Sequence, residues 1–154
     1  MKVLEIKTAL QIQKNPKTVY EAIIEPAHMV NYFISKSSGR MEAGKELVWN
    51  FPEFSLDVAL KVVKTQPYKL ISYFWIVEGE KHLVEISLIP EENDSTLVHI
   101  TENGRANDDA GIKWLVENTA GWANFLACLK AYLEYGINLR KGGFDFLRNT
   151  PPIV

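Results

Sequence analysis

The order of two hydrophobic patterns along the chain constrains the fold more than any other feature. Between residues 37 and 102, apolar and polar residues alternate with a period of two, and short turn sequences interrupt them. This pattern predicts a run of antiparallel strands. From about Ala110 to Tyr135, apolar residues recur every three or four positions instead, which predicts one long helix ending at Gly136. The chain must therefore bury one face of a sheet against a single helix, an α+β arrangement.

Before the long helix we expect seven strands and two short helices. The first strand covers residues 4–12, and Asn15 with Pro16 begins a helix that continues to about Ile24. A second short helix covers residues 27–33. The remaining strands are expected at residues 39–41, 46–51, 54–66, 69–77, 81–89 and 95–102.

Composition excludes several classes of protein. The 154 residues provide one domain of ordinary size, and 17 basic residues nearly balance 19 acidic ones. This balance gives no support to a nucleic-acid partner. No apolar run reaches the roughly 18 residues of a membrane span, and no signal peptide is evident, so we expect a cytoplasmic protein. The one cysteine, Cys128, cannot form an internal disulfide, and we expect an inert thiol that is poorly placed for a buried nucleophile.

The segment from Gly121 to Glu134 resembles the Gly-Trp-x-x-Phe-Leu-x-x-Leu pattern of a known family. Weaker similarities lie at residues 19–23, at residues 69–71 with Trp75, and at residues 96–104. Together they resemble the START-like, or SRPBCC, superfamily, and within it the activators of the heat-shock protein 90 ATPase. The resemblance implies a helix-grip fold, as in a birch-pollen allergen, over residues 1–140. Residues 141–154 then form a tail that we expect to dock.

The resemblance implies several functions, because the superfamily includes ligand binders, co-chaperones and enzymes. We favour a non-catalytic domain that binds a small hydrophobic or amphipathic molecule, such as a lipid. The first alternative is a co-chaperone-like interaction module of the stress response. Eukaryotic activators carry an additional N-terminal domain, for which 154 residues leave no room. The second alternative is a cyclase-like or hydrolase-like enzyme.

In this fold the sheet and the helix often enclose an apolar cavity. Strand alternation and helical spacing supply the side chains that we expect to line it, with two indoles at its mouth. The predicted ligand-binding residues are Trp49, Val58, Leu60, Trp75, His82, Val84, Ile86, Val98, Ile100, Glu102, Trp122, Leu126, Leu129 and Leu133. The alternative is a filled core with no cavity.

His82 and Glu102 extend two apolar strand faces and offer acid–base chemistry. If the turn at residues 91–94 pairs Leu88 with Val98, Glu102 lies opposite Val84 and diagonal to His82. The two side chains then form an acid–base pair or orient the polar group of a ligand. Strand ends are commonly exposed, however, and this favours positions in solvent for both.

The long helix carries a second apolar stripe formed by Trp114, Phe125 and Tyr132. This stripe docks on the two short helices, receives the tail, or pairs with a second copy in a homodimer. In the tail, Phe144 and Phe146 follow two glycines and also need a partner. The helix is expected to kink or break at residues 118–121.

Other apparent motifs point to no cofactor and no metal. Residues 39–45 match the start of a phosphate-binding loop, but Glu46 replaces the required Ser or Thr. The three histidines lack the spacing of metal ligands. Arg40 offers a partner for a ligand carboxylate, although a solvated position is favoured for it.

Overall fold

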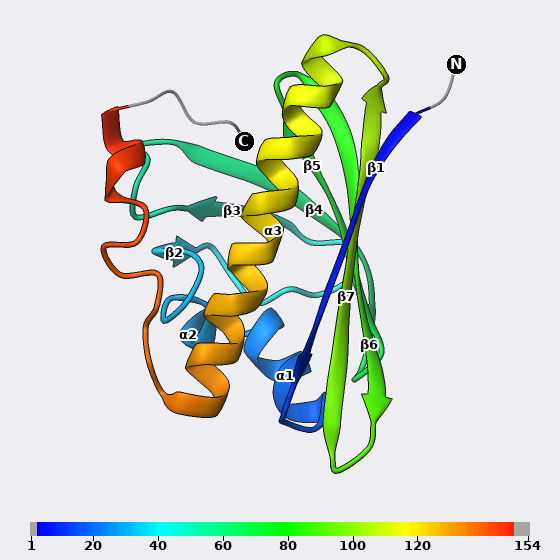
Figure 1. The fold of residues 1–154 in the computed structure, drawn as a ribbon, viewed down its shortest axis with the longest axis vertical. Coiled ribbons are helices and arrows are strands. Elements are labelled where there is room, and N and C mark those ends of the chain that lie inside the picture. Colours follow the sequence, from blue (N-terminus) through cyan, green and yellow to red (C-terminus); the bar gives the residue numbers. More distant parts are fainter. Residues whose placement is uncertain (1–2, 150–154) are drawn as a thin grey trace.

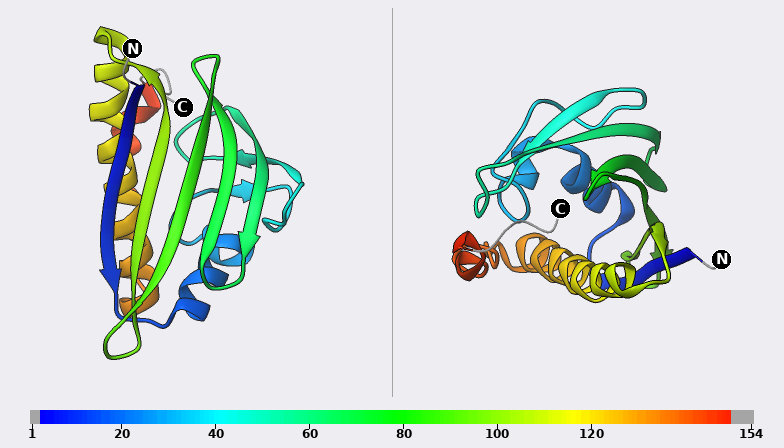
Figure 2. Two further views of the ribbon diagram at one scale, coloured as in Figure 1. Left: turned by 90° about the vertical axis from the view of Figure 1, so that its right-hand side faces the viewer. Right: turned by 90° about the horizontal axis from the view of Figure 1, so that it is seen from above.

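The computed structural model describes residues 3–149 and has the helix-grip fold. Seven strands form one antiparallel sheet in the order β1-β7-β6-β5-β4-β3-β2, and the helix α3 crosses its inner face (Figure 1). Seen from above, the sheet curves around one side of α3 (Figure 2). No helix in this part of the chain has the apolar length that crossing a bilayer requires.

The bounds of the elements follow the sequence patterns closely. The strands are β1 (Val3–Ile12), β2 (Lys36–Ser37), β3 (Glu46–Asn50), β4 (Asp57–Gln66), β5 (Leu70–Val77), β6 (Glu80–Glu91) and β7 (Ser95–Ala106). The helices are α1 (Pro16–Ile24), α2 (Pro26–Met29), α3 (Asp109–Tyr135) and the 3-10 helix η1 (Asp145–Asn149).

Local chemistry fixes the ends of the helices. Asn15 begins α1, because its side-chain oxygen accepts a 2.8 Å hydrogen bond from the backbone N–H of Thr18. Asp108 begins α3 in the same way, by accepting from the N–H of Gly111 at 2.8 Å. Gly136 ends α3 in the left-handed region, with φ of 65°.

The strand register agrees with the prediction from the turn at residues 91–94. Leu88 pairs with Val98, and Val84 pairs with Glu102. β1 then pairs with β7 along its whole length, so the first and last strands lie side by side and α3 packs against β1. The register places His82 and Glu102 on the face of the sheet that α3 covers.

Some predicted elements differ from the structure. Residues 39–41 form no strand, and the short strand before β3 is β2 instead. The second helix is shorter than predicted, ending at Met29. The predicted kink or break at residues 118–121 is absent, because α3 continues as one helix from Asp109 to Tyr135. Ile112 belongs to the apolar pattern of residues 110–135 that predicted the helix, but it is exposed.

Aromatic side chains fill most of the space between the sheet and α3. Trp49 packs edge-on against Phe33, Tyr73 and Trp75, while Trp122 contacts Phe33 and Trp75. A cavity of only about 10 Å³ lies among them. Such a volume has room for about one water molecule and for no organic ligand.

Candidate functional site

A buried carboxylate joins the sheet to the helix at the centre of the candidate site. Glu102 on β7 has 0% of its surface exposed. Its Oε1 accepts a hydrogen bond of 2.7 Å from Nε1 of Trp122, and its Oε2 accepts one of 3.2 Å from Nε1 of Trp75. His82 Nδ1 lies 2.9 Å from the same Oε2. We call these four residues the Glu102 cluster. Three N–H donors compensate the cost of burying the charge.

The side chain of His82 is completely buried, with 0% of its surface exposed. Because a carboxylate only accepts hydrogen bonds, the proton shared with Glu102 belongs to Nδ1 of His82. The other nitrogen, Nε2, is buried without a hydrogen-bond partner and lies 4.0 Å from a carboxylate oxygen of Glu80. The ring of Trp114 meets the imidazole edge-on at 5.0 Å, and the backbone near Gly104 covers it.

These positions correct one expectation and confirm another. The expectation that His82 and Glu102 lie in solvent is wrong, because α3 covers these strand positions with Trp114 and Trp122. The predicted contact between the two side chains is confirmed. Both carboxylate oxygens are occupied by N–H donors, so the Glu102 cluster fixes two indoles in place and presents no free oxygen to a ligand.

An apolar pocket is lined by the two indoles of the Glu102 cluster, Trp75 and Trp122, which are both buried. We call it the tail pocket, because Phe144, Phe146 and Leu147 of the C-terminal segment form one of its walls. Phe33, Phe51, Phe54, Trp75 and Trp122 form its other apolar walls. Its volume is about 330 Å³, and five α3 residues close to Trp122 complete the lining from the helix side: Glu117, Asn118, Ala120, Gly121 and Asn124.

The predicted ligand-binding residues separate into two groups. Trp75 and Trp122 line the tail pocket. Nine others are buried in the core between sheet and helix: Trp49, Val58, Leu60, Val84, Ile86, Val98, Ile100, Leu126 and Leu129. Leu133 is half-buried at the edge of this core. The inner face predicted as cavity wall is therefore mostly packed, and the space for a ligand lies at its mouth.

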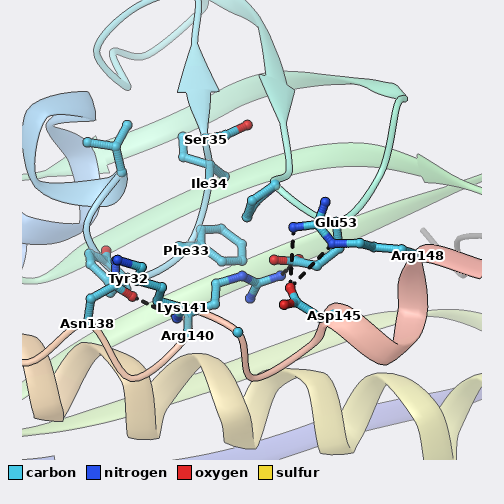
Figure 3. A pocket seen from close by; sticks show the side chains of 13 residues that line it. Tyr32, Phe33, Ile34, Ser35, Glu53, Asn138, Arg140, Lys141, Asp145 and Arg148 are labelled. Atoms are coloured by element: carbon cyan, nitrogen blue, oxygen red, sulfur yellow. Dashed lines mark hydrogen bonds and ion pairs between the residues drawn. The ribbon is translucent and has the colours of Figure 1, made fainter.

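A second, polar pocket adjoins the tail pocket (Figure 3). It has a volume of about 340 Å³ and lies between residues 30–35 and the segment after α3. Arg140 lines both pockets and pairs with Glu53 at 2.5 Å. Asp145 and Arg148 form an ion pair of 3.3 Å at the outer side, as the dashed lines in Figure 3 show.

The second apolar stripe of α3 is covered within the chain. Phe125 packs against Phe33 at a ring distance of 4.7 Å, and Tyr132 stacks on Tyr32 at 5.7 Å. Trp114 is buried against His82. The first alternative, docking on the short helices, holds for Phe125 and Tyr132, because both pack against residues that directly follow α2. A homodimer through Trp114, Phe125, Tyr132 and the tail stays a prediction; Trp114 and Phe125 are buried, and Tyr132 is half-buried.

Two further expectations fell on residues outside the two pockets. Arg40 pairs with Glu25 at 2.6 Å and with Glu21 at 3.0 Å, and so faces α1. Cys128 was expected away from the core, but it is buried, and burial raises the pKa of its thiol. Residues 150–154 of the predicted tail lie outside the described part of the chain.

Sequence reasoning missed Phe51, Phe54, Arg140 and the tail as parts of one pocket. The aromatic residues of the tail gave a usable signal, because exposed Phe residues require a partner. Nothing in the sequence brought residue 140 next to residue 53, since this contact depends on how the chain turns back after α3. Among residues 3–149, no group of His, Cys, Asp or Glu is arranged to hold a metal ion.

The family model for "Activator of Hsp90 ATPase homolog 1-like protein" matches residues 13–134. The chain belongs to this family. The match includes the strands that carry His82 and Glu102 and nearly all of α3, and ends before Arg140 and the tail. No curated protein matches the chain.

Solved structures share the fold. Protein SSP2350 from Staphylococcus saprophyticus is 29% identical, with a TM-score of 0.78 over 89% of this chain and 96% of that one. The Aha1 dimer from Colwellia psychrerythraea is 23% identical, with a TM-score of 0.72, and the match covers 86% of this chain and 98% of that one. CalU16 from Micromonospora echinospora is 19% identical, with a TM-score of 0.70, and the match covers 95% of this chain and 84% of that one.

Proposed function

We propose that this protein is a non-catalytic, cytoplasmic domain that binds a small hydrophobic or amphipathic molecule in the tail pocket. The observation that carries the proposal is an apolar pocket of about 330 Å³ walled by two indoles and several phenyl rings. Pockets for small molecules begin at about this volume and are lined mainly by aromatic and aliphatic side chains. The pocket also has the few polar groups that orient a ligand, from Asn118, Asn124 and Arg140.

The Glu102 cluster supports binding more than catalysis. Its hydrogen bonds hold Trp75 and Trp122 in fixed orientations before any ligand arrives. Preorganised walls reduce the entropy lost on binding. A general acid or base must reach the reacting group directly or through one water. Glu102 is separated from the tail pocket by the indoles that it holds, so the His82–Glu102 pair that the enzyme alternative uses does not reach the pocket.

An uncharged fluorescent probe tests this function. N-phenyl-1-naphthylamine should bind the purified protein with a saturable increase in fluorescence. Gly121 lines the pocket from α3, and a Cβ at this position meets no atom within 4 Å. The variant Gly121→Leu therefore fills the pocket and also favours the helix. We expect its affinity for the probe to fall about tenfold or more, with no loss of stability.

Ala123→Leu is the matched control, because residue 123 is exposed on the same helix and does not line the pocket. Its affinity for the probe should equal that of the wild type. No binding by the wild type contradicts the proposed function. Equal binding by Gly121→Leu and the wild type contradicts its location.

The family supports a second candidate, a co-chaperone-like module that acts on a heat-shock protein 90 ATPase. The tail pocket then accepts an apolar side chain of the chaperone in place of a small molecule. Addition of this protein to the chaperone from the same organism should raise the rate of ATP hydrolysis. An unchanged rate contradicts this candidate and leaves the binding of small molecules intact.

A further inference from the structure

Arg140 occupies an unusual position on the wall between the two pockets. Its guanidinium carbon lies 4.7 Å from the ring centre of Phe144, 5.7 Å from that of Phe51 and 5.9 Å from that of Phe33. The side chain is only 14% exposed, and that of its partner Glu53 only 3%. A cation is therefore held among aromatic rings at the edge of an apolar pocket, and Figure 3 shows Arg140 beside one of these rings, Phe33.

The guanidinium has unused hydrogen-bonding capacity. Arginine carries five N–H donors, and Glu53 takes one of the Nη2 donors of Arg140. The Nε donor of Arg140 is buried and has no partner among the described residues. Buried donors are nearly always paired in native proteins, so this exception calls for a partner that residues 3–149 do not supply.

The charges around Arg140 come from both pockets. Arg140 and Glu117 are the charged residues among those that line the tail pocket. Beyond Arg140, the polar pocket adds Lys141, which is exposed, and Arg148, which is paired with Asp145. With Glu53 included, three cations and three anions line the two pockets, and Arg140 is the cation that the two pockets share. Apolar walls strengthen the attraction of an anion to this cation, because they exclude water.

We propose that the ligand of the tail pocket is an amphipathic anion with an apolar or aryl body and one carboxylate. The body lies against Trp75 and Trp122, and the carboxylate pairs with the guanidinium of Arg140. This inference rests on the proposed function, and it specifies the chemical class of the ligand. Arginine suits this role because it stays charged and binds carboxylates through directed N–H groups.

Decanoate and 1-decanol test the inference, because they share an alkyl chain and differ in charge. At about pH 8 decanoate is ionised. Calorimetric titration of the wild type should give a dissociation constant for decanoate about tenfold or more below that for decanol. Arg140→Gln should remove this preference, with decanol binding retained.

Glu53→Gln is the matched variant, because it breaks the same ion pair while it leaves the cation in place. Recognition of charge predicts opposite effects on the preference for decanoate over decanol, so Glu53→Gln should keep or raise the preference that Arg140→Gln removes. If the pair only holds the pocket together, both variants lose affinity for the two probes to the same extent, and the inference is overturned. Equal binding of the two probes by the wild type also overturns it and leaves the proposed function standing. If neither probe binds the wild type, both the inference and the proposed function are contradicted.

Discussion

The Nε1 of Trp122 donates a 2.7 Å hydrogen bond to Oε1 of Glu102, and this bond connects the middle of α3 to β7 inside the core. The same indole also lines the tail pocket. Trp75 repeats this arrangement from β5, through its 3.2 Å bond to Oε2. Glu102 is therefore a positioning residue, because it sets the orientation of two pocket walls without contact with the pocket.

Glu102→Gln should destabilise the fold by about 3 kcal/mol, because removal of one partner from a buried charged cluster leaves its neighbours unsatisfied. The new amide group also has to place its own N–H groups among three N–H donors. Urea unfolding measures the loss as a lower midpoint with an unchanged slope. Glu91→Gln, on the exposed end of β6, should change stability by less than about 0.5 kcal/mol. If Glu102→Gln also loses less than about 0.5 kcal/mol, the structural role of Glu102 is contradicted.

Glu134 should make stability depend on pH. Burial raises the pKa of this carboxyl. Hydrogen bonds from Lys130 at 2.5 Å and from the backbone N–H of Gln13 at 3.0 Å lower the pKa by more than burial raises it, so the net shift is downward from the ordinary value of 4.5. A lowered pKa stabilises the folded state above the ordinary value, and this stabilisation disappears as the pH falls through the folded-state pKa. Glu134→Gln should therefore lose about 1–2 kcal/mol at neutral pH. The gap to the wild type should close in strong acid. A gap that stays constant down to strong acid would contradict the assignment.

Cys128 should react slowly with thiol reagents in the native protein. It is 3% exposed, and burial raises the pKa of its thiol, which lowers the fraction of reactive thiolate. Labelling by a disulfide reagent should be much slower in the folded protein than in guanidinium chloride. Fast labelling under native conditions would show that the packing of α3 against the sheet opens readily.

The ion pair between Arg140 and Glu53 should hold the segment after α3 in place. It connects this segment to the loop between β3 and β4 while both side chains are largely buried. Glu53→Gln should speed trypsin cleavage after Lys141 and Arg148, because a protease needs a locally detached segment. Glu42→Gln breaks the exposed pair with Lys45 and serves as the control, with no change in rate. Equal rates for the two variants would show that the aromatic contacts hold the segment alone.

The sheet and the helix followed from local patterns in the sequence. The turn at residues 91–94 fixed the pairing of Leu88 with Val98, and from this pairing the contact between His82 and Glu102 followed by geometry. The burial of both residues did not follow. It depends on where α3 crosses the sheet, which placed Trp114 and Trp122 over strand positions that are commonly exposed.

The position of the pocket was harder to predict than the fold. Alternation identified the inner faces of the strands but not the volume of the side chains that meet there, and Trp49, Tyr73 and Phe33 fill that space. Contacts such as that between Arg140 and Glu53 join residues far apart in sequence and have no periodic signal. A hydrophobic pattern predicts which side chains are buried, whereas a pocket depends on where packing is incomplete.

The most direct test of ligand binding in the tail pocket is the NMR spectrum of the four indole N–H groups during titration with N-phenyl-1-naphthylamine. Trp75 and Trp122 line the pocket, whereas Trp49 and Trp114 do not. The resonances of Trp75 and Trp122 should shift in proportion to the bound fraction, while the other two stay in place. Saturable binding with shifts confined to Trp49 or Trp114, or with no indole shift, would contradict binding in this pocket.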